Sequence, residues 1–241
     1  MRTEKYQEFF TKEFLMGPNS IRLLDELLEK TPKALTGRVL DLGCGRGLTS
    51  LFLAKETAAE QVFATDLWIS ATTNARSFEA WGEEKKIIPI HADAMELPYA
   101  MELPYAEAYF DAIVSIDAYH YFGCADNVFA EKILSLLKKG GYALLAVPGL
   151  KQEFGEKVPA LMNEWAGEDV KTFHSCEWWE EHIKQGAEDK VEVTVMESER
   201  YDVIWNDWYR SGHEYALQDK VFMDKGVADM MNFVLMVVKK L

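Results

Sequence analysis

From residue 38 onward, short apolar runs alternate with longer amphipathic stretches. Runs of this length are typical of strands, and their alternation with helical stretches indicates βαβ units around a parallel sheet. The runs that fit strands are residues 39–42, 61–65, 87–91, 112–116, 142–147, 191–195 and 232–238. The pattern therefore predicts an α/β fold with a seven-stranded sheet.

The amphipathic stretches between these strands predict helices at residues 48–55, 69–81, 127–138 and 176–185. Gly140 and Gly141 are expected to end the third of these helices as a C-cap pair. Before residue 36, apolar positions recur at three- and four-residue spacing and predict two further helices. A break at residues 16–20 separates them, and Asn19 or Ser20 can cap the second.

A chain of 241 residues with 49% hydrophobic content is long enough for one sizeable core, so we expect a single domain, 1–241. Its parts are a helical cover at 1–36, a core of βαβ units at 37–148 and a completion of the sheet at 149–241. Within the last part, residues 201–226 are unusually rich in aromatic side chains: Trp205, Trp208, Tyr209, Tyr215 and Phe222. We expect this segment to form a lid or an interface.

A glycine-rich turn follows the first strand, where residues 43–47 read G-C-G-R-G and lead into a helix. Glycines suit a turn in which a nucleoside approaches the backbone closely. A dinucleotide fingerprint needs a further glycine at position 48, where this chain has Leu48. The turn therefore favours a nucleoside ligand without a pyrophosphate, and a tight turn without any ligand is the alternative.

A carboxylate ends the second predicted strand. Asp66 lies at the spacing after the glycine turn at which an acidic residue binds ribose hydroxyls in nucleotide-binding βαβ folds. Asp66 alone could instead cap the following helix. Leu67 and Trp68 come next and could flank an adenine ring or pack within that helix. Together with the glycine turn, these residues favour a bound nucleoside.

The run D-L-G-C-G-R-G at residues 41–47 resembles motif I of class I S-adenosylmethionine-dependent methyltransferases, of the small-molecule type similar to methyltransferase type 11. Related features continue over residues 38–148. The resemblance implies a Rossmann-like, mostly parallel sheet with helices on both faces, plus the N-terminal helices and a lid in the C-terminal half. It also implies S-adenosyl-L-methionine as the cofactor, with Gly43, Cys44 and Gly45 around its methionine end. Asp41 would help to hold that end, since a carboxylate suits ammonium and sulfonium charges.

Asp93 resembles the acidic residue after the third strand that binds the adenine amino group in this family, and Ala94 follows it. The hexapeptide at residues 95–100 is repeated without change at 101–106, in an expected loop before the fourth strand. Removing one copy restores the family's customary spacing from Asp93 to Phe110. We therefore interpret the repeat as a tolerated duplication, natural or introduced in cloning.

The fourth predicted strand leads into S-I-D-A-Y-H-Y-F at residues 115–122, at the end of the sheet where open α/β folds bind ligands. We expect the methyl acceptor here. His120 is a candidate general base because its ordinary pKa lies near neutrality, although it could equally be a structural histidine. The hydroxyls of Tyr119 and Tyr121 are alternative bases. Asp117 is predicted to contact the cofactor or orient the acceptor, with a helix cap as the alternative.

The acidic composition bears on the class of acceptor. A formal net charge of -14 repels phosphate backbones. The DNA amino-methyltransferases of the family carry Asp/Asn-Pro-Pro-Tyr where residues 117–120 read D-A-Y-H. We therefore expect a small-molecule substrate, no nucleic acid, and a monomer or homodimer, while the acceptor atom (N, O or C) stays open. The rival functions are a non-catalytic cofactor-binding or regulatory module and a nicotinamide-dependent oxidoreductase.

The cysteines and histidines suggest no metal site and no disulfide framework. Cys44, Cys124 and Cys176 lie far apart without a CxxC pair, and the histidines lack metal-ligand spacing. No apolar run is long enough to span a bilayer, and the first residues are too polar for a signal peptide. We therefore expect a cytoplasmic protein with reduced thiols, no bound metal and no membrane partner.

Overall fold

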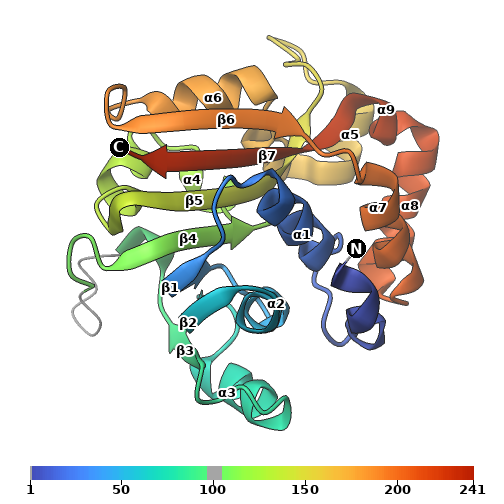
Figure 1. Cartoon of the computed structure of the whole chain (residues 1–241). Coiled ribbons are helices and arrows are strands. Elements are labelled where there is room, and N and C mark those ends of the chain that lie inside the picture. Colours follow the sequence, from blue (N-terminus) through green and yellow to red (C-terminus); the bar gives the residue numbers. More distant parts are fainter. Residues whose placement is uncertain (1, 97–104) are drawn as a thin grey trace.

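One seven-stranded sheet forms the centre of the molecule (Figure 1). The structure is a computed structural model that describes residues 2–96 and 105–241, so most of the hexapeptide repeat lies outside the described residues. The sheet order is β3-β2-β1-β4-β5-β7-β6. The strands are β1 (Thr36–Leu42), β2 (Ala58–Asp66), β3 (Ile87–His91), β4 (Phe110–Ile116), β5 (Leu137–Leu150), β6 (Val191–Glu197) and β7 (Met231–Lys240).

The pairing within the sheet confirms the predicted α/β architecture. β1 to β5 pair in parallel, whereas β7 is antiparallel to both of its neighbours, β5 and β6. The strand order reverses at β1, which pairs with β2 on one side and with β4 on the other. Ligands of open α/β folds bind at such a reversal, beyond the carboxyl ends of the strands. The fold therefore places a binding crevice beyond β1 and β4.

Helices cover both faces of the sheet (Figure 1). Because successive strand residues point to opposite faces, Val39 and Leu40 of β1 enter two different apolar clusters, and both faces are buried. The helices and helical turns are η1 (Arg2–Phe9), α1 (Ser20–Lys30), α2 (Leu48–Glu56), α3 (Ala71–Ala80), η2 (Ala94–Glu96), α4 (His120–Gly123), η3 (Phe129–Ile133), α5 (Ala160–Ala166), η4 (Gly167–Thr172), α6 (Cys176–Lys184), α7 (Tyr201–Arg210), α8 (Glu214–Phe222), η5 (Met223–Val227) and α9 (Ala228–Met230).

The prediction of a helix over residues 127–138 is wrong at its C-terminal end. Helical structure there covers little more than η3, and β5 begins at Leu137, which pairs with Phe110. Gly140 and Gly141 consequently lie inside β5 and do not cap a helix. The apolar residues of this stretch fit a helix and a strand equally well, and the pairing with β4 decides in favour of the strand.

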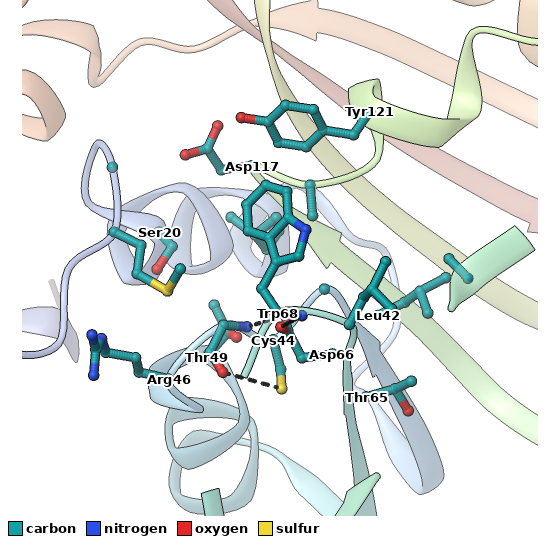
Figure 2. A pocket seen from close by; sticks show the side chains of 18 of the residues that line it. Ser20, Leu42, Cys44, Arg46, Thr49, Thr65, Asp66, Trp68, Asp117 and Tyr121 are labelled. Carbon is teal, nitrogen blue, oxygen red and sulfur yellow. Dashed lines mark hydrogen bonds between the residues drawn. The ribbon is translucent and has the colours of Figure 1, made fainter. Parts of the chain in front are cut away.

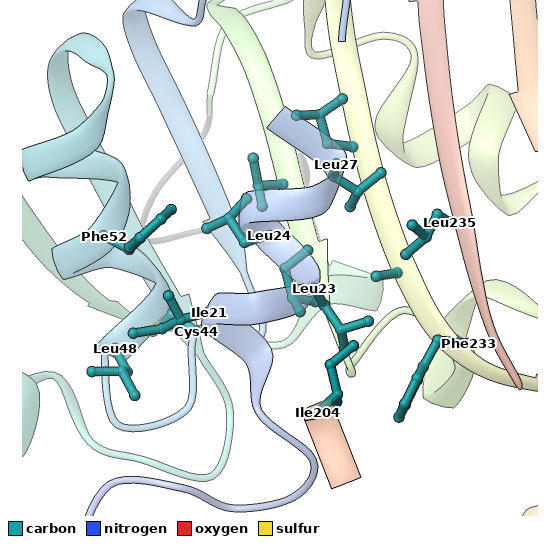
Figure 3. Packing of buried hydrophobic residues seen from close by; sticks show 14 of the residues in the cluster. Ile21, Leu23, Leu24, Leu27, Cys44, Leu48, Phe52, Ile204, Phe233 and Leu235 are labelled. Carbon is teal, nitrogen blue, oxygen red and sulfur yellow. The ribbon is translucent and has the colours of Figure 1, made fainter. Parts of the chain in front are cut away.

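Helix α1 fixes the N-terminal cover to the sheet (Figure 3). Its residues Ile21, Leu24 and Leu27 are fully buried, in the same apolar cluster as Phe52 of α2 and Phe233 of β7. Each such side chain contributes about 1.5–3 kcal/mol through burial of apolar surface. The predicted second helix of the N-terminal segment is thus confirmed, whereas the first is the 3-10 helix η1.

A buried polar network joins the start of α1 to α7. The Asn19 side-chain oxygen accepts hydrogen bonds from the backbone N–H groups of Ile21 and Arg22, as expected of the helix cap. Its Nδ2 donates to Asp207 Oδ2 at 2.8 Å, and the Arg22 guanidinium forms an ion pair with the same carboxylate. The segment that leads into α1 is therefore held against α7.

Asn19→Ala is expected to lower the free energy of unfolding by about 2 kcal/mol, because it removes a helix cap and leaves Asp207 with one donor fewer. Ser70→Ala is the matched comparison, since the Ser70 side chain caps the exposed start of α3 through local bonds to Thr73 and contacts no other helix through a hydrogen bond among the described residues. We expect a loss of about 1 kcal/mol there. Urea unfolding measures the free energy of unfolding of both variants. Equal losses of stability would contradict a stabilising role for the Asn19–Asp207 hydrogen bond between α1 and α7.

In the described ranges, no helix combines the length and the apolar character needed to cross a bilayer.

Candidate active site

A cavity of about 380 Å³ lies at the strand-order reversal (Figure 2). Its walls come from the loop after β1 (residues 43–46), the loop after β2 (65–68) and the loop after β3 (92–95). Residues 116–118 after β4, the start of α4, and the N-terminal segment at residues 14–20 complete it. The structure therefore brings four separately predicted sequence features to one place.

The glycine turn after β1 cannot carry side chains at two of its positions. Gly43 has φ +78°, and a Cβ there would stand 2.3 Å from the Cβ of Ala118. Gly47 has φ +83°, and its Cβ would stand 2.4 Å from the ring of Phe78 on α3. Positive φ and close approach both require glycine. The turn is thus packed tightly between α3 and the loop after β4, with its backbone along the cavity.

Asp41 lies behind this turn and not on the cavity wall. Its Oδ2 accepts hydrogen bonds from the hydroxyls of Thr49 and Ser50 at 2.7 and 2.5 Å, at the start of α2. Burial raises the pKa of Asp41 to about 6 even though these two donors lower it. The structure therefore corrects the expectation of direct cofactor contact: Asp41 positions the turn through α2.

Asp66 joins the glycine turn to the loop after β2. Its Oδ2 accepts a hydrogen bond from the Gly45 backbone N–H at 2.8 Å, and its Oδ1 accepts from those of Trp68 and Ile69, also at 2.8 Å. The carboxylate is nearly buried, yet it lines the cavity. Leu67 and Trp68 line it as well, with 48% and 66% of their side chains exposed. Both interpretations of Asp66, as a local cap and as a cavity carboxylate, fit this geometry.

Asp93 and Ala94 form the next part of the wall, after β3. Asp93 Oδ1 accepts a hydrogen bond from the Met95 backbone N–H at 2.8 Å. Leu67, on the adjacent loop, is held through its backbone oxygen, which lies 2.8 Å from His91 Nε2. The predicted adenine end of the site is thus built from neighbouring strand ends, and its role stays a prediction.

Asn74 supports the glycine turn and was not singled out from the sequence. Its Nδ2 donates to the Gly45 backbone oxygen at 2.9 Å and to Cys44 Sγ at 3.5 Å. Burial raises the pKa of the Cys44 thiol well above its usual value, so this thiol stays protonated. A signal was present in the sequence: Asn74 lies one helical turn before the buried Phe78, on the core side of α3.

Tyr119 and His120 do not line the cavity, which corrects two of the three catalytic candidates. Tyr119 is fully buried against Phe122 and Trp179. His120 is also buried, and burial lowers its pKa to about 3, so it is a very weak base near neutral pH. The structural interpretation of His120 is the one that the geometry supports.

Asp117 and Tyr121 remain at the cavity wall from the acceptor candidates. Asp117 has φ +56° at the end of β4, and its backbone N–H donates to the Ala146 oxygen at 2.7 Å. Burial, with a smaller contribution from Asp219, raises the pKa of Asp117 to about 7. The Tyr121 and Trp68 rings meet with centroids 5.3 Å apart, and both lie next to Asp117 (Figure 2).

The aromatic segment at residues 201–226 lies outside the cavity wall. It forms α7, which packs beside α1, and α8, which packs beside α7 and α5, and none of its residues lines the cavity. Its function as a lid therefore stays a prediction, while the N-terminal residues Phe14, Met16 and Gly17 do reach the cavity. Among residues 2–96 and 105–241, no group of three or more metal-ligating side chains occurs.

Comparison with known proteins finds sequence similarity to methyltransferases. Residues 39–141 match the sequence model of a methyltransferase domain. The chain is 26% identical over 175 residues to the 27-O-demethylrifamycin SV methyltransferase of Amycolatopsis mediterranei (strain S699), covering 69% of this chain and 59% of that protein. The matched region and the sheet order give this chain the fold of the class I methyltransferases.

Solved methyltransferase structures share this fold. Phosphoethanolamine N-methyltransferase 2 of Haemonchus contortus, in complex with S-adenosyl-L-methionine, superimposes with a TM-score of 0.72 at 19% identity over 98% of this chain and 55% of that one. Geranyl diphosphate C-methyltransferase of Streptomyces coelicolor A3(2) gives a TM-score of 0.64 at 14% identity over 92% and 74%. The chain spans little more than half the length of the Amycolatopsis and Haemonchus relatives.

Proposed function

We propose that this methyltransferase binds S-adenosyl-L-methionine in the cavity after β1, β2 and β4 and transfers its methyl group to a small molecule. The observation that carries the proposal is the Asp66 carboxylate, which lines the cavity and is bonded to the glycine turn on one side and to Trp68 N–H on the other. One residue thus ties the predicted methionine subsite to the predicted nucleoside subsite.

The residues present fit the cofactor. Gly45 has no side chain, which leaves space for a ligand between the turn and Met16. A Cβ at position 45 would occupy that space and lie 3.1 Å from Met16 Sδ. Asp66 offers carboxylate oxygens at the place where ribose hydroxyls would lie, and Asp93 offers them at the adenine end. Leu67 presents an exposed apolar surface for the flat base, whereas the Trp68 ring lies next to Tyr121. The bound cofactor would supply a methyl group already activated by its positively charged sulfur.

The chain's own contribution is mainly positioning. A methyl group on a sulfonium needs no further activation, so alignment of donor and acceptor provides most of the rate. The segment at residues 14–20 closes one side of the cavity and limits contact with water. The acceptor is expected beside Asp117 and Tyr121, which line the cavity and lie apart from Asp66 in Figure 2.

Three related enzymes named above act, by their names, on nitrogen, oxygen and carbon, so family membership leaves the acceptor atom open. A net charge of -14 argues against a nucleic-acid acceptor.

Production of S-adenosylhomocysteine tests the proposal. Purified protein is incubated with S-adenosylmethionine and a panel of small amines, phenols, carboxylic acids and thiols, with Asp66→Ala as the matched variant. We expect turnover with at least one class and little with the variant. Binding of the cofactor without turnover on any class would favour the non-catalytic module, and no binding would refute the proposal.

A further inference from the structure

Asp117 is a partly buried carboxylate on the cavity wall, and among the described residues no hydrogen bond reaches its oxygens. The backbone of the N-terminal segment lies directly against it, because a Cβ on Gly17 would stand 2.6 Å from Asp117 Oδ2. The loop after β4 holds the residue in a left-handed conformation that few side chains adopt. A carboxylate that is partly removed from water and faces a cavity favours a cationic or hydrogen-bond-donating ligand there.

Two aromatic rings stand beside this carboxylate on the cavity wall (Figure 2). Trp68 is 66% exposed and Tyr121 is 50% exposed, although large rings are normally covered. Their planes meet at 63°, so the two rings form a corner next to Asp117. A carboxylate beside exposed aromatic faces is the arrangement that binds ammonium groups, through charge attraction and cation–π contact.

Further negative charges surround Asp117 and the two rings. Asp219 of α8 acts electrostatically on Asp117, and Asp169 of η4 acts on Tyr121. Both therefore lie close enough to the corner to lower the energy of a positive charge there. The cation that lines this cavity, Arg46, lies on the glycine turn, and Figure 2 shows its guanidinium directed away from Asp117.

We propose that the acceptor of this methyltransferase is a positively charged amine, held with its nitrogen against the Asp117 carboxylate and the faces of Trp68 and Tyr121. This inference rests on the proposed function and names the substrate class for the same site. The corner formed by Asp117, Trp68 and Tyr121 is called the cation corner below.

Proton transfer to Asp117 precedes methyl transfer. A protonated amine first gives a proton to the Asp117 carboxylate, which frees the nitrogen lone pair. The nitrogen then bonds to the methyl carbon while the carbon–sulfur bond breaks, and the electron pair of that bond remains on sulfur. The product nitrogen carries the positive charge that sulfur loses, and Asp117 releases its proton to water. The raised pKa of Asp117, about 7, suits a group that accepts and returns a proton near neutral pH.

A pair of probes that differ only in charge tests the cation corner directly. Choline and its uncharged carbon analogue 3,3-dimethylbutanol are titrated calorimetrically into protein saturated with S-adenosylhomocysteine, whose own binding is measured first. We expect choline to bind at least about tenfold more tightly than the neutral analogue. Equal affinities, or no binding of either probe to the loaded protein, would overturn the proposal. Failure to bind S-adenosylhomocysteine would instead count against the proposed function.

Variants separate the cation corner from a general effect of charge. Asp117→Asn is expected to lower choline affinity about tenfold, and Tyr121→Leu about fivefold, whereas Tyr121→Phe keeps the ring and should change little. Asp126→Asn is the control, because it removes the same charge from an exposed position outside the cavity. If Asp117→Asn weakens S-adenosylmethionine but leaves choline and S-adenosylhomocysteine unchanged, Asp117 serves the sulfonium and the proposal is wrong.

The pH dependence of choline binding follows from the pKa of Asp117. Choline keeps its charge at every pH, so only the protein titrates. The charged or titratable groups near the corner include Asp66, Asp93 and Arg46 of the cavity wall, His120 beside the Tyr121 ring, and Asp169 and Asp219. Protonation of Asp117 below its pKa of about 7 removes the attraction, so choline affinity should rise severalfold between about pH 6 and about pH 8. The Asp117→Asn variant should show no such rise, and a flat profile in the unmodified protein would contradict the assignment.

Discussion

Replacing Gly43 by alanine is expected to lower the affinity for S-adenosylmethionine at least about a hundredfold and the free energy of unfolding by about 3 kcal/mol. The new methyl group would stand 2.3 Å from the Cβ of Ala118, and φ +78° disfavours any side chain. The turn can relieve the overlap only by moving away from the loop after β4. That movement displaces the Gly45 N–H from Asp66 and distorts the cavity wall.

Gly82→Ala is the matched control for this variant. Gly82 has φ +71°, and a Cβ there would meet nothing within 4 Å. The control therefore adds the same backbone strain without the overlap, far from the cavity wall. We expect it to cost about 1–2 kcal/mol of stability and to leave cofactor affinity within about twofold. Similar affinities for the two variants, measured by calorimetry beside urea unfolding, would contradict the close packing of the turn.

Asp66→Ala is expected to weaken cofactor binding by about a hundredfold to a thousandfold. The substitution removes the acceptor of three backbone N–H groups, those of Gly45, Trp68 and Ile69, so both loops lose their common support. It also removes the carboxylate proposed for the ribose hydroxyls. The cofactor affinity of Asp66→Asn should fall between those of the unmodified protein and Asp66→Ala. The asparagine amide keeps one acceptor oxygen, but its NH₂ group faces a backbone N–H and cannot accept from it.

Asp111→Ala controls for the loss of a strand-end aspartate. Asp111 lies at the opposite end of the sheet, where its carboxylate accepts from Arg38 N–H at 2.9 Å and pairs with Lys138 at 2.7 Å. Its removal should lower stability by about 1–2 kcal/mol and leave cofactor affinity unchanged. Equal affinity losses in the Asp111 and Asp66 variants would refute a specific role for Asp66.

The elements that the sequence specified well are those whose patterns are local. Strand-length apolar runs such as residues 112–116 and 232–238 gave the strands, and Asn19 gave the cap of α1. The end of the helix predicted over 127–138 failed because Leu137 joins the sheet through Phe110, a partner distant in sequence. The sheet order and the antiparallel direction of β7 also depend on pairings between distant segments, which no local pattern contains.

The site shows the same division. The glycine turn and Asp66 were recognisable from residue type and spacing, because backbone geometry and ligand chemistry both restrict them. His120 could not be assigned, since its burial depends on packing from segments distant in sequence, such as Phe173. Asn74 was missed because its partners, the Gly45 oxygen and Cys44, lie on another element. The position of a residue at the cavity could be predicted where local sequence sets it, and the burial of a side chain could not; the chemical roles stay predictions.

We expect the cavity in which Asp66 joins the glycine turn to the loop after β2 to bind S-adenosylmethionine. Calorimetric titration of S-adenosylmethionine into the unmodified protein and into Asp66→Ala, in one buffer, tests it most directly. The account predicts saturable one-to-one binding to the unmodified protein and at least about a hundredfold weaker binding to a folded Asp66→Ala. Absence of binding to the unmodified protein, or equal affinity of the two proteins, would contradict it.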